Sequence, residues 1–244
     1  MFYGSYRFRS SSWKCSSKSY LRQDWQRLCP LSRSKVFFDV ASSLDGFIAP
    51  EGMDLAHAND PDFKQWMSQW SKLQAWVFQQ KFFRENLKLG EGGETGHDNR
   101  MVEETFKRTG VSILGKRMFD AGERLWPEEA PFHTPVYVVT HTVRKPWARP
   151  GGTTFYFVND GIANALGEAR KAAGSRDIRI GGGANVIQQY LRAGLVDEFT
   201  VHYSPVFFGN SERLFNGIGK DVNVRLKEAV PSKNVTHVTF EVVK

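Results

Sequence analysis

The sequence predicts an α/β fold of three layers, with helices on both faces of a mostly parallel central sheet and an antiparallel hairpin at the C-terminus. Two observations lead to this fold class. Short apolar segments rich in strand-forming residues alternate with segments whose apolar residues recur every three or four positions. The last two strand-like segments then follow one another with no helix between them. The alternation is typical of a parallel sheet covered by helices, and the final pair is typical of an antiparallel edge.

Each expected strand is a short run of β-branched, aromatic or aliphatic residues. Residues 136–140 and 153–158 are almost continuously apolar or aromatic, whereas residues 198–203 alternate with the period of a strand. In chain order, strands are expected at residues 36–41, 111–115, 136–140, 153–158, 178–180, 198–203, 226–230 and 236–243.

The expected helices are recognised by apolar spacing and by the glycines that end them. Trp66, Trp70 and Leu73 are spaced by four and three positions, which predicts an amphipathic helix between residues 61 and 86. The glycine-rich residues 90–99 are expected to form a loop. Further helices are expected at residues 103–108, from residue 116 onward, at 162–173 and at 184–193.

Composition divides the chain into a short leader and a single domain. Residues 1–35 hold eight of the 33 Lys and Arg residues but only one acidic residue, so they account for the whole formal charge of +7. We therefore expect residues 1–34, which are rich in Ser and Arg, to be a disordered or non-native leader, and residues 35–244 to form one domain. The leader has the composition of an organellar transit peptide. A leader added for expression, or a wrongly chosen start codon, is the alternative.

Charge, hydropathy and cysteine content exclude several functional classes. The domain is neutral overall and carries no nucleic-acid motif, so we expect no nucleic-acid partner. No run approaches the roughly 18 apolar residues that cross a bilayer, so we expect no membrane association. Cys15 and Cys29 lie in the leader and the six histidines lack ligand spacing, so no metal is expected. A domain without cysteine fits a reducing compartment, and we expect a cytoplasmic protein unless the leader directs organellar import.

Gly181, Gly182 and Gly183 lie between an expected strand and an expected helix, where phosphate is commonly bound. The unpaired N–H groups and partial positive charge of a helix N-terminus attract phosphate, and glycine lets the backbone approach it closely. A plain flexible turn is the alternative, but such a turn needs one or two glycines rather than three. The spacing matches neither GxGxxG nor GK[ST]. The sequence therefore predicts a phosphate-binding turn that differs from both motifs.

A second candidate phosphate contact is the segment from Gly115 to Met118, which contains Lys116 and Arg117. Two cations at a helix start oppose the helix dipole, and an anion between them would offset that cost. A solvated helix start is the alternative. Together with the glycine turn, the pair suggests a dinucleotide with an extra phosphate, so NADP rather than NAD.

Three further features of the sequence are candidates for the functional site, and for each a structural role is also considered. Asp45 precedes Gly46 in a common turn pair, but a carboxylate at a strand end can also bind a polar substrate. His141 follows a strand and is a candidate cofactor contact. The tryptophans at positions 66, 70 and 76 are expected to be helix core or a subunit contact rather than a binding box.

Five segments in order resemble one known family, the reductase domain of the bifunctional riboflavin-biosynthesis deaminase–reductase and its stand-alone, dihydrofolate-reductase-like bacterial relatives. The segments are residues 41–49, 114–119, 138–141, 181–185 and 194–209. The resemblance covers about residues 35–244 and implies a dihydrofolate-reductase-like fold, NADPH as cofactor and a homodimer. The sequence departs from the family in Lys116-Arg117, where a Gly-Arg pair is usual, and in the longer segment between residues 61 and 109. No deaminase domain is present, so riboflavin synthesis by the paired route is not supported.

The resemblance also implies which residues hold the cofactor. They are Ala41, Ile48 and Ala49 at the nicotinamide, Gly115, Lys116, Arg117 and Met118 at the phosphates, Thr140 and His141 at the adenosine ribose phosphate, and Gly181, Gly182, Gly183, Ala184 and Asn185 at the pyrophosphate. Dihydrofolate reductases bind the pterin with a carboxylate on their first helix. The comparable stretch here offers Asp54, Asp60 or Asp62, and the sequence does not choose among them.

These observations lead to the hypothesis of an NADPH-dependent oxidoreductase that transfers a hydride to a small, pterin- or pyrimidine-like heterocycle. Asp45 is the candidate catalytic residue, positioning the substrate or relaying a proton. Trp126 and Phe208 are the candidate walls of the substrate pocket. The alternative is a non-catalytic NADPH-binding module used for sensing or for partner binding, in which the same glycine turn would be retained.

Overall fold

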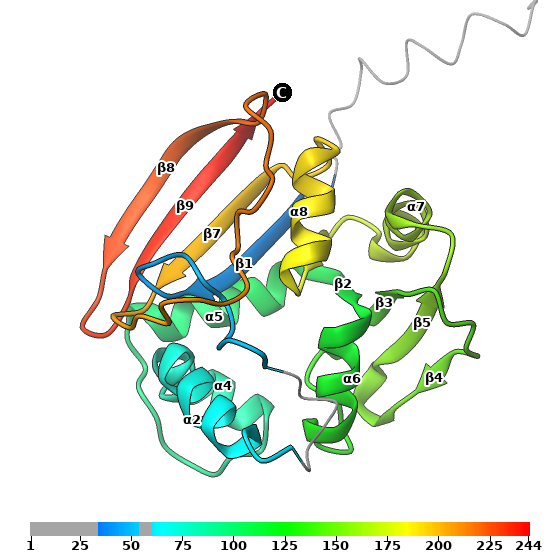
Figure 1. Ribbon diagram of the computed structural model, residues 1–244. Coiled ribbons are helices and arrows are strands. Elements are labelled where there is room, and N and C mark those ends of the chain that lie inside the picture. Colours follow the sequence, from blue (N-terminus) through cyan, green and yellow to red (C-terminus); the bar gives the residue numbers. More distant parts are fainter. Residues whose placement is uncertain (1–33, 54–59) are drawn as a thin grey trace, which may run out of the picture. The chain divides into compact units, whose positions relative to one another are not determined.

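The computed structural model describes residues 34–53 and 60–244 (Figure 1). Within these residues nine strands form one sheet. The strands are β1 (Val36–Ser42), β2 (Thr109–Gly115), β3 (Pro135–Val139), β4 (Trp147–Ala148), β5 (Thr154–Val158), β6 (Asp177–Ile180), β7 (Glu198–Tyr203), β8 (Asn223–Pro231) and β9 (Thr236–Val243). Their order across the sheet is β4-β5-β3-β2-β6-β1-β7-β9-β8. Of the expected leader, only Ser34 is among the described residues. Asp54 and His57 lie outside the described residues.

The sheet is mostly parallel, as predicted. Six adjacent strands run parallel to one another, in the order β5, β3, β2, β6, β1 and β7. At one edge β9 and β8 follow as an antiparallel pair. The short β4 pairs antiparallel with β5 at the other edge. A parallel centre with a C-terminal antiparallel hairpin confirms the predicted fold class.

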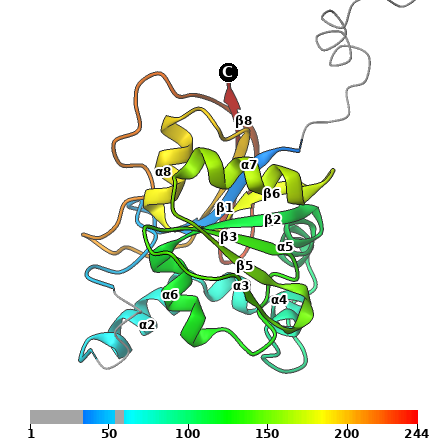
Figure 2. The same ribbon diagram turned by 90° about the vertical axis from the view of Figure 1, so that its right-hand side faces the viewer.

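Helices cover both faces of the sheet, so the described residues form three layers (Figure 2). They are α2 (Phe63–Leu73), α3 (Ala75–Phe78), α4 (Lys81–Asn86), α5 (His97–Arg108), α6 (Lys116–Leu125), α7 (Ile162–Ala173) and α8 (Ala184–Arg192), with one 3-10 turn, η1 (Pro150–Gly152). Helices α7 and α8 pack on one face, and α2 to α6 lie on the other.

The prediction of one helix between residues 61 and 86 was wrong. The chain breaks after α2 and again at Gln80, which is extended and forms a bridge with Glu94. The N–H of Lys81 donates to the Glu94 carbonyl, and the Glu94 N–H donates to the Gln79 carbonyl. This pairing between distant residues takes the backbone out of the helical conformation although the apolar spacing continues. The loop expected at residues 90–99 is also shorter than predicted, since α5 already begins at His97.

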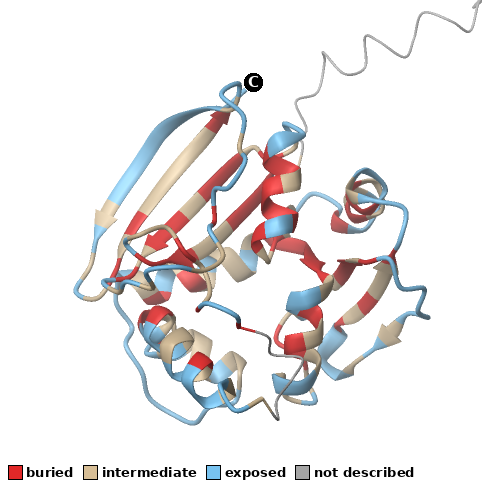
Figure 3. Cartoon of the chain, in the orientation of Figure 1, coloured by how far each residue is buried: buried red, intermediate tan, exposed pale blue. Residues whose placement is uncertain are grey.

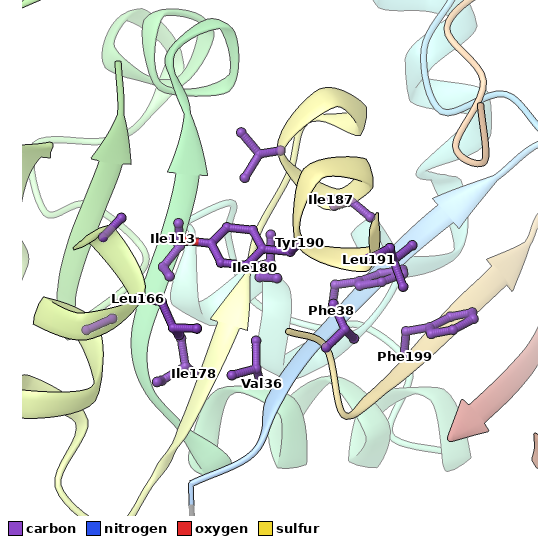
Figure 4. Packing of buried hydrophobic residues seen from close by; sticks show 14 of the residues in the cluster. Val36, Phe38, Ile113, Leu166, Ile178, Ile180, Ile187, Tyr190, Leu191 and Phe199 are labelled. Atoms are coloured by element: carbon purple, nitrogen blue, oxygen red, sulfur yellow. The ribbon is translucent and has the colours of Figure 1, made fainter. Parts of the chain in front are cut away.

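The main core lies between the sheet and helices α7 and α8. Val36 and Phe38 of β1 are fully buried and pack towards Ile187 and Tyr190 of α8, and Phe38 stacks on Phe199 (Figure 4). Side chains alternate between the faces of a strand. Residues 37, 39 and 41 of β1 therefore point to the opposite face, where the candidate site lies. Figure 3 shows that burial is concentrated in the central strands, whereas β8 is exposed almost throughout.

Glu198 at the start of β7 is the centre of a buried ion-pair cluster. Its carboxylate lies 2.7 Å from Arg108 Nη1 and 2.8 Å from Lys35 Nζ. Burial alone would raise the pKa of Glu198, but the hydrogen bonds and charges of Lys35 and Arg108 outweigh burial and lower it from 4.5 to about 2. The cluster fastens β1 and α5 to β7.

We expect this cluster to make the protein sensitive to acid. A carboxylate with a lowered pKa contributes stability that is present above pH 4.5 and is lost as the pH falls towards 2. The Glu198→Gln variant should lose about 2 kcal/mol at neutral pH and unfold with a weaker dependence on pH in this window. Denaturant unfolding at several pH values measures both effects. Glu241→Gln, which removes an exposed ion pair with Arg225, should change neither, and identical acid sensitivity of Glu198→Gln and the unmodified protein would contradict the assignment.

Candidate active site

A cavity of about 1110 Å³ opens at the carboxyl ends of β1, β2, β3 and β6, on the face covered by α2 to α6. Ligands of open α/β sheets bind at this end of the strands. The cavity is lined by strand ends, by the first turns of α6 and α8, and by side chains of α2 and α3. It is large enough for a dinucleotide's reactive end together with a small substrate.

The three glycines form the turn that joins β6 to α8. The Gly181 N–H donates to the Ile113 carbonyl at 2.9 Å, and the Gly115 N–H donates to the Gly182 carbonyl at 2.8 Å. Gly182 has a φ of +114°, a conformation that favours glycine. A Cβ atom at Gly182 or Gly183 would meet no heavy atom within 4 Å, so the backbone is open beside both residues. The turn therefore leaves room for a ligand at the N-terminus of α8.

The two cations at the start of α6 both line the cavity and both have carboxylate partners. Lys116 Nζ lies 2.6 Å from Asp120 Oδ1, one turn along the same helix. Arg117 pairs with Glu212 at 3.0 Å, and its Nη2 donates to the Met53 carbonyl. The carboxylates offset the cost of placing cations at a helix N-terminus. The Arg117 side chain is nevertheless 73% exposed, so it is accessible to a phosphate that enters the cavity.

The structure brings nearly all of the predicted site residues together. The residues that line the cavity are Ala41, Ile48, Ala49, Gly115, Lys116, Arg117, Met118, Trp126, Thr140, His141, Gly181, Gly182, Gly183, Ala184 and Asn185. They come from five segments of the chain, which the parallel sheet places at one edge. Asp45 and Phe208 are not among the residues that line this cavity.

The Asp45 carboxylate is already engaged in holding two loops together. It accepts hydrogen bonds from the Ser43 hydroxyl and from the backbone N–H groups of Phe208 and Gly209. Desolvation opposes ionisation, but these hydrogen bonds outweigh it and lower the pKa of Asp45. These hydrogen bonds give Asp45 a structural role, and neither Asp45 nor Phe208 lines the cavity that gathers the other predicted site residues.

Tryptophans form part of the cavity wall. Trp126 stacks on Phe155 with ring centroids 5.4 Å apart, which fixes its ring beside α6. Trp70 and Trp76, which were expected to be helix core or a subunit contact, also line the cavity. Trp76 is 5% exposed, and its indole N–H has no hydrogen-bond partner among the described residues.

The floor of the cavity holds polar residues that sequence reasoning missed. Asp39 Oδ1 accepts a hydrogen bond from Arg179 Nε at 2.6 Å, and Asp39 Oδ2 lies 3.9 Å from His202 Nε2. All three residues line the cavity. Burial alone would raise the pKa of Asp39, but the charge of Arg179 and the contact with His202 hold it well below its usual range. A charged residue inside each apolar strand, Asp39 in β1 and Arg179 in β6, was the available signal.

Among the described residues, neither candidate position for the carboxylate that binds pterin in dihydrofolate reductases lies at the cavity. Asp60 and Asp62 do not line the cavity, and Asp54 lies outside the described residues. Asp39 instead brings a carboxylate into the cavity from the first strand. Across residues 34–53 and 60–244, no group of three or more His, Cys, Asp or Glu side chains is arranged to hold a metal ion. No helix within the same residues has the length and apolarity to span a membrane.

Comparison with known proteins identifies the family and the fold. Residues 34–238 match the family model described as the RibD C-terminal domain. A Bacillus subtilis protein named YyaP, described as uncharacterized, is 34% identical over 70 residues, which are 29% of this chain and 37% of that protein. The match thus spans little more than a third of this curated relative's length.

Solved structures agree with the fold. A putative riboflavin biosynthesis protein from Shewanella sp. PV-4 superposes with a TM-score of 0.57 at 18% identity, covering 86% of this chain and 99% of that one. Enterococcus faecalis dihydrofolate reductase, solved with NADP(H), gives 0.51 at 14% identity over 87% and 98% of the two chains. The Thermotoga maritima diaminohydroxyphosphoribosylaminopyrimidine deaminase/5-amino-6-(5-phosphoribosylamino)uracil reductase gives 0.52 at 17% identity over 91% and 62%. The dihydrofolate-reductase-like fold is therefore confirmed.

Proposed function

The chain belongs to the RibD C-terminal domain family and is an oxidoreductase, and from this premise we propose that it uses NADPH to reduce a small pyrimidine-like heterocycle. One observation carries the proposal: the segments predicted to bind NADPH, which are scattered from residue 41 to residue 185, line a single cavity. NADPH would supply a hydride to a C=O or C=N carbon of the substrate. The protein's contribution is to bind, orient and provide charge.

The residues at the cavity suit a phosphorylated dinucleotide. The open backbone at Gly182 and Gly183, at the N-terminus of α8, would hold the pyrophosphate. Lys116 and Arg117 supply positive charge beside it, and Thr140 with His141 would contact the adenosine ribose phosphate. At the other end of the cavity, the apolar Ala41, Ile48 and Ala49 would line the nicotinamide. These assignments leave the polar floor around Asp39 for the substrate.

The pyrimidine-like substrate class is supported by the family and by a named relative. One solved neighbour is a 5-amino-6-(5-phosphoribosylamino)uracil reductase, and a bicyclic pterin is the substrate class of another. The paired Asp39 and Arg179 can recognise the alternating donors and acceptors that both ring types present.

A cofactor titration followed by a substrate assay tests the proposal. We expect NADPH to quench the fluorescence of the cavity tryptophans at micromolar concentration, and NADH to bind at least about tenfold more weakly. NADPH oxidation with 5-amino-6-(5-phosphoribosylamino)uracil, and separately with dihydrofolate, then distinguishes the substrate classes. Absence of quenching at millimolar NADPH would refute the cofactor assignment. Binding without oxidation of any pyrimidine or pterin would favour the non-catalytic module.

A further inference from the structure

Four ionisable side chains lie in a line from the cavity floor to helix α5, joined by two hydrogen bonds and, between Asp39 and His202, by a longer ion-pair contact. Asp39 Oδ2 lies 3.9 Å from His202 Nε2, and His202 Nδ1 lies 2.7 Å from His237 Nδ1. His237 Nε2 in turn lies 3.3 Å from Asp98 Oδ1. Register places the two histidines directly opposite each other on β7 and β9, and both are almost fully buried. The line therefore consists of two imidazoles between two carboxylates.

The number of protons on the two rings determines how many contacts in this line contain an N–H group. It has three junctions: carboxylate to ring, ring to ring, and ring to carboxylate. Each junction is favourable only when it contains one N–H, because two unprotonated atoms repel and two N–H groups clash. Two neutral imidazoles supply only two N–H groups, so one junction stays empty. One additional proton fills all three, and the two carboxylates balance its charge.

Burial and several charged or titratable groups surround the two rings. Burial and the neighbouring His202 lower the pKa of His237 to about 4, although Asp98 acts in the opposite direction. The other groups facing the pair are Arg179, which binds the far oxygen of Asp39, and His97, whose ring centroid lies 6.2 Å from that of His237. Of the two rings, His202 lines the cavity and His237 does not, so a proton passed from the pair to a substrate would leave from His202 Nε2.

We propose that the His202–His237 pair stores a proton and delivers it from His202 Nε2 to the substrate during reduction. This inference rests on the proposed function. Hydride addition to a C=O or C=N bond forms a new C–H bond and leaves the π electron pair on the oxygen or nitrogen. That atom takes the proton from His202, forming O–H or N–H, and the pair becomes neutral. NADPH is oxidised, the substrate is reduced, and one proton is consumed from the pair.

The outer end of the line provides the return path. Asp98 lies at the start of α5, its side chain is 13% exposed, and it also accepts a hydrogen bond from the Ser232 hydroxyl. A proton from solvent can reach Asp98, pass to His237 Nε2 and shift across the ring-to-ring hydrogen bond to His202. The indole N–H of Trp76, whose ring packs on both imidazoles and lines the cavity, has no hydrogen-bond partner among the described residues and would be available to an acceptor atom of the substrate.

Nitrogen NMR of the histidine side chains tests the proton store directly, without substrate or NADPH. We expect His202 and His237 to titrate as one unit that takes up a single proton, so that the pair carries three ring N–H groups in place of two. His133, which is exposed and outside the line, should titrate independently. Asp98→Asn, a change at the outer end, should move the midpoint of the pair to lower pH. Two neutral rings at all pH values, or two rings that titrate independently like His133, would overturn the proposal.

Kinetics in single-turnover mode tests the delivery. With NADPH and 5-amino-6-(5-phosphoribosylamino)uracil, His202→Gln should slow reduction by about 100-fold and abolish the solvent deuterium isotope effect. His237→Gln should lower the rate at neutral pH about tenfold and shift the pH profile, because His237 positions the proton without touching substrate. NADPH affinity should change by less than twofold in both variants, and His133→Gln should match the unmodified protein. An unchanged pH profile in His237→Gln would overturn the relay.

The failure of this inference is distinguishable from the failure of the proposed function. If NADPH does not bind, the function fails, whereas the NMR titration still decides whether the pair stores a proton. If NADPH binds and is oxidised but the pair never gains a proton, only the relay fails.

Discussion

Gly183→Asp is expected to weaken NADPH binding by about 100-fold or more while leaving the protein at least as stable. Gly183 is the N-cap residue of α8 with φ −80° and ψ −170°, a backbone conformation that Asp adopts easily. No heavy atom lies within 4 Å of a Cβ added at this residue. Asp is among the most favourable N-cap residues. The same carboxylate would occupy the place proposed for the pyrophosphate and repel it, and a loss of about 2.7 kcal/mol corresponds to 100-fold in affinity. Fluorescence titration with NADPH and thermal unfolding measure the two effects.

Gly183→Asn is the matched control for this prediction. Asn has nearly the same size and also caps helices well, but it carries no charge. We expect its NADPH affinity to fall much less than that of the Asp variant, since only steric displacement remains. Raising the ionic strength should narrow the gap between the two variants. Equal affinities of Gly183→Asp and the unmodified protein would show that the pyrophosphate lies elsewhere.

Arg179→Met is expected to destabilise the fold by about 3 kcal/mol, because it leaves the Asp39 carboxylate buried without its main partner. The two side chains are 22% and 11% exposed, and the Arg179 Nε to Asp39 Oδ1 distance is 2.6 Å. Removing one member of a buried pair costs more than the pair contributes, since the remaining charge is then uncompensated. Urea unfolding at neutral pH gives the change in the free energy of unfolding.

The double variant Asp39→Leu/Arg179→Met separates this mechanism from a simple loss of packing. We expect it to recover most of the lost stability, because two apolar side chains replace the pair and no charge is left buried. Arg144→Met, which removes an ion pair with Glu123 near the surface, should cost less than about 1 kcal/mol. A double variant as unstable as Arg179→Met alone would contradict the charge argument.

The sequence predicts the elements whose signals are local. Helix α7 and strands β7 and β9 were predicted with the bounds that the structure has, because their residue patterns define them and Gly174 ends α7. Strand β4 was missed, since two residues carry no period. The breaks between residues 61 and 86 were missed because the Gln80–Glu94 bridge depends on tertiary pairing rather than on spacing.

The residues of the candidate site also differ in whether their signal is local in the sequence. The cofactor segments lie next to strand ends and glycines, so their chemistry is visible along the chain and the cavity contains them all. The polar floor is different, because Asp39 and Arg179 are 140 residues apart and each looks like an isolated charge in an apolar strand. The histidine pair likewise depends on the register between β7 and β9. For Asp45 the sequence left two interpretations open, because a turn residue and a catalytic carboxylate look alike until the hydrogen bonds are known.

The position of β1 has a consequence for how the protein is made. This strand lies between β6 and β7, so Val36 pairs with Ile178, and Phe37 pairs with Arg179 and Glu198. During synthesis β1 emerges from the ribosome early, and its partner strands emerge more than 140 residues later. Until then β1 is exposed and has no strand to pair with. The middle of the sheet therefore closes only near the end of translation. Nucleotide binding by a nascent chain would accordingly report that the whole domain, and not its first half, has been completed.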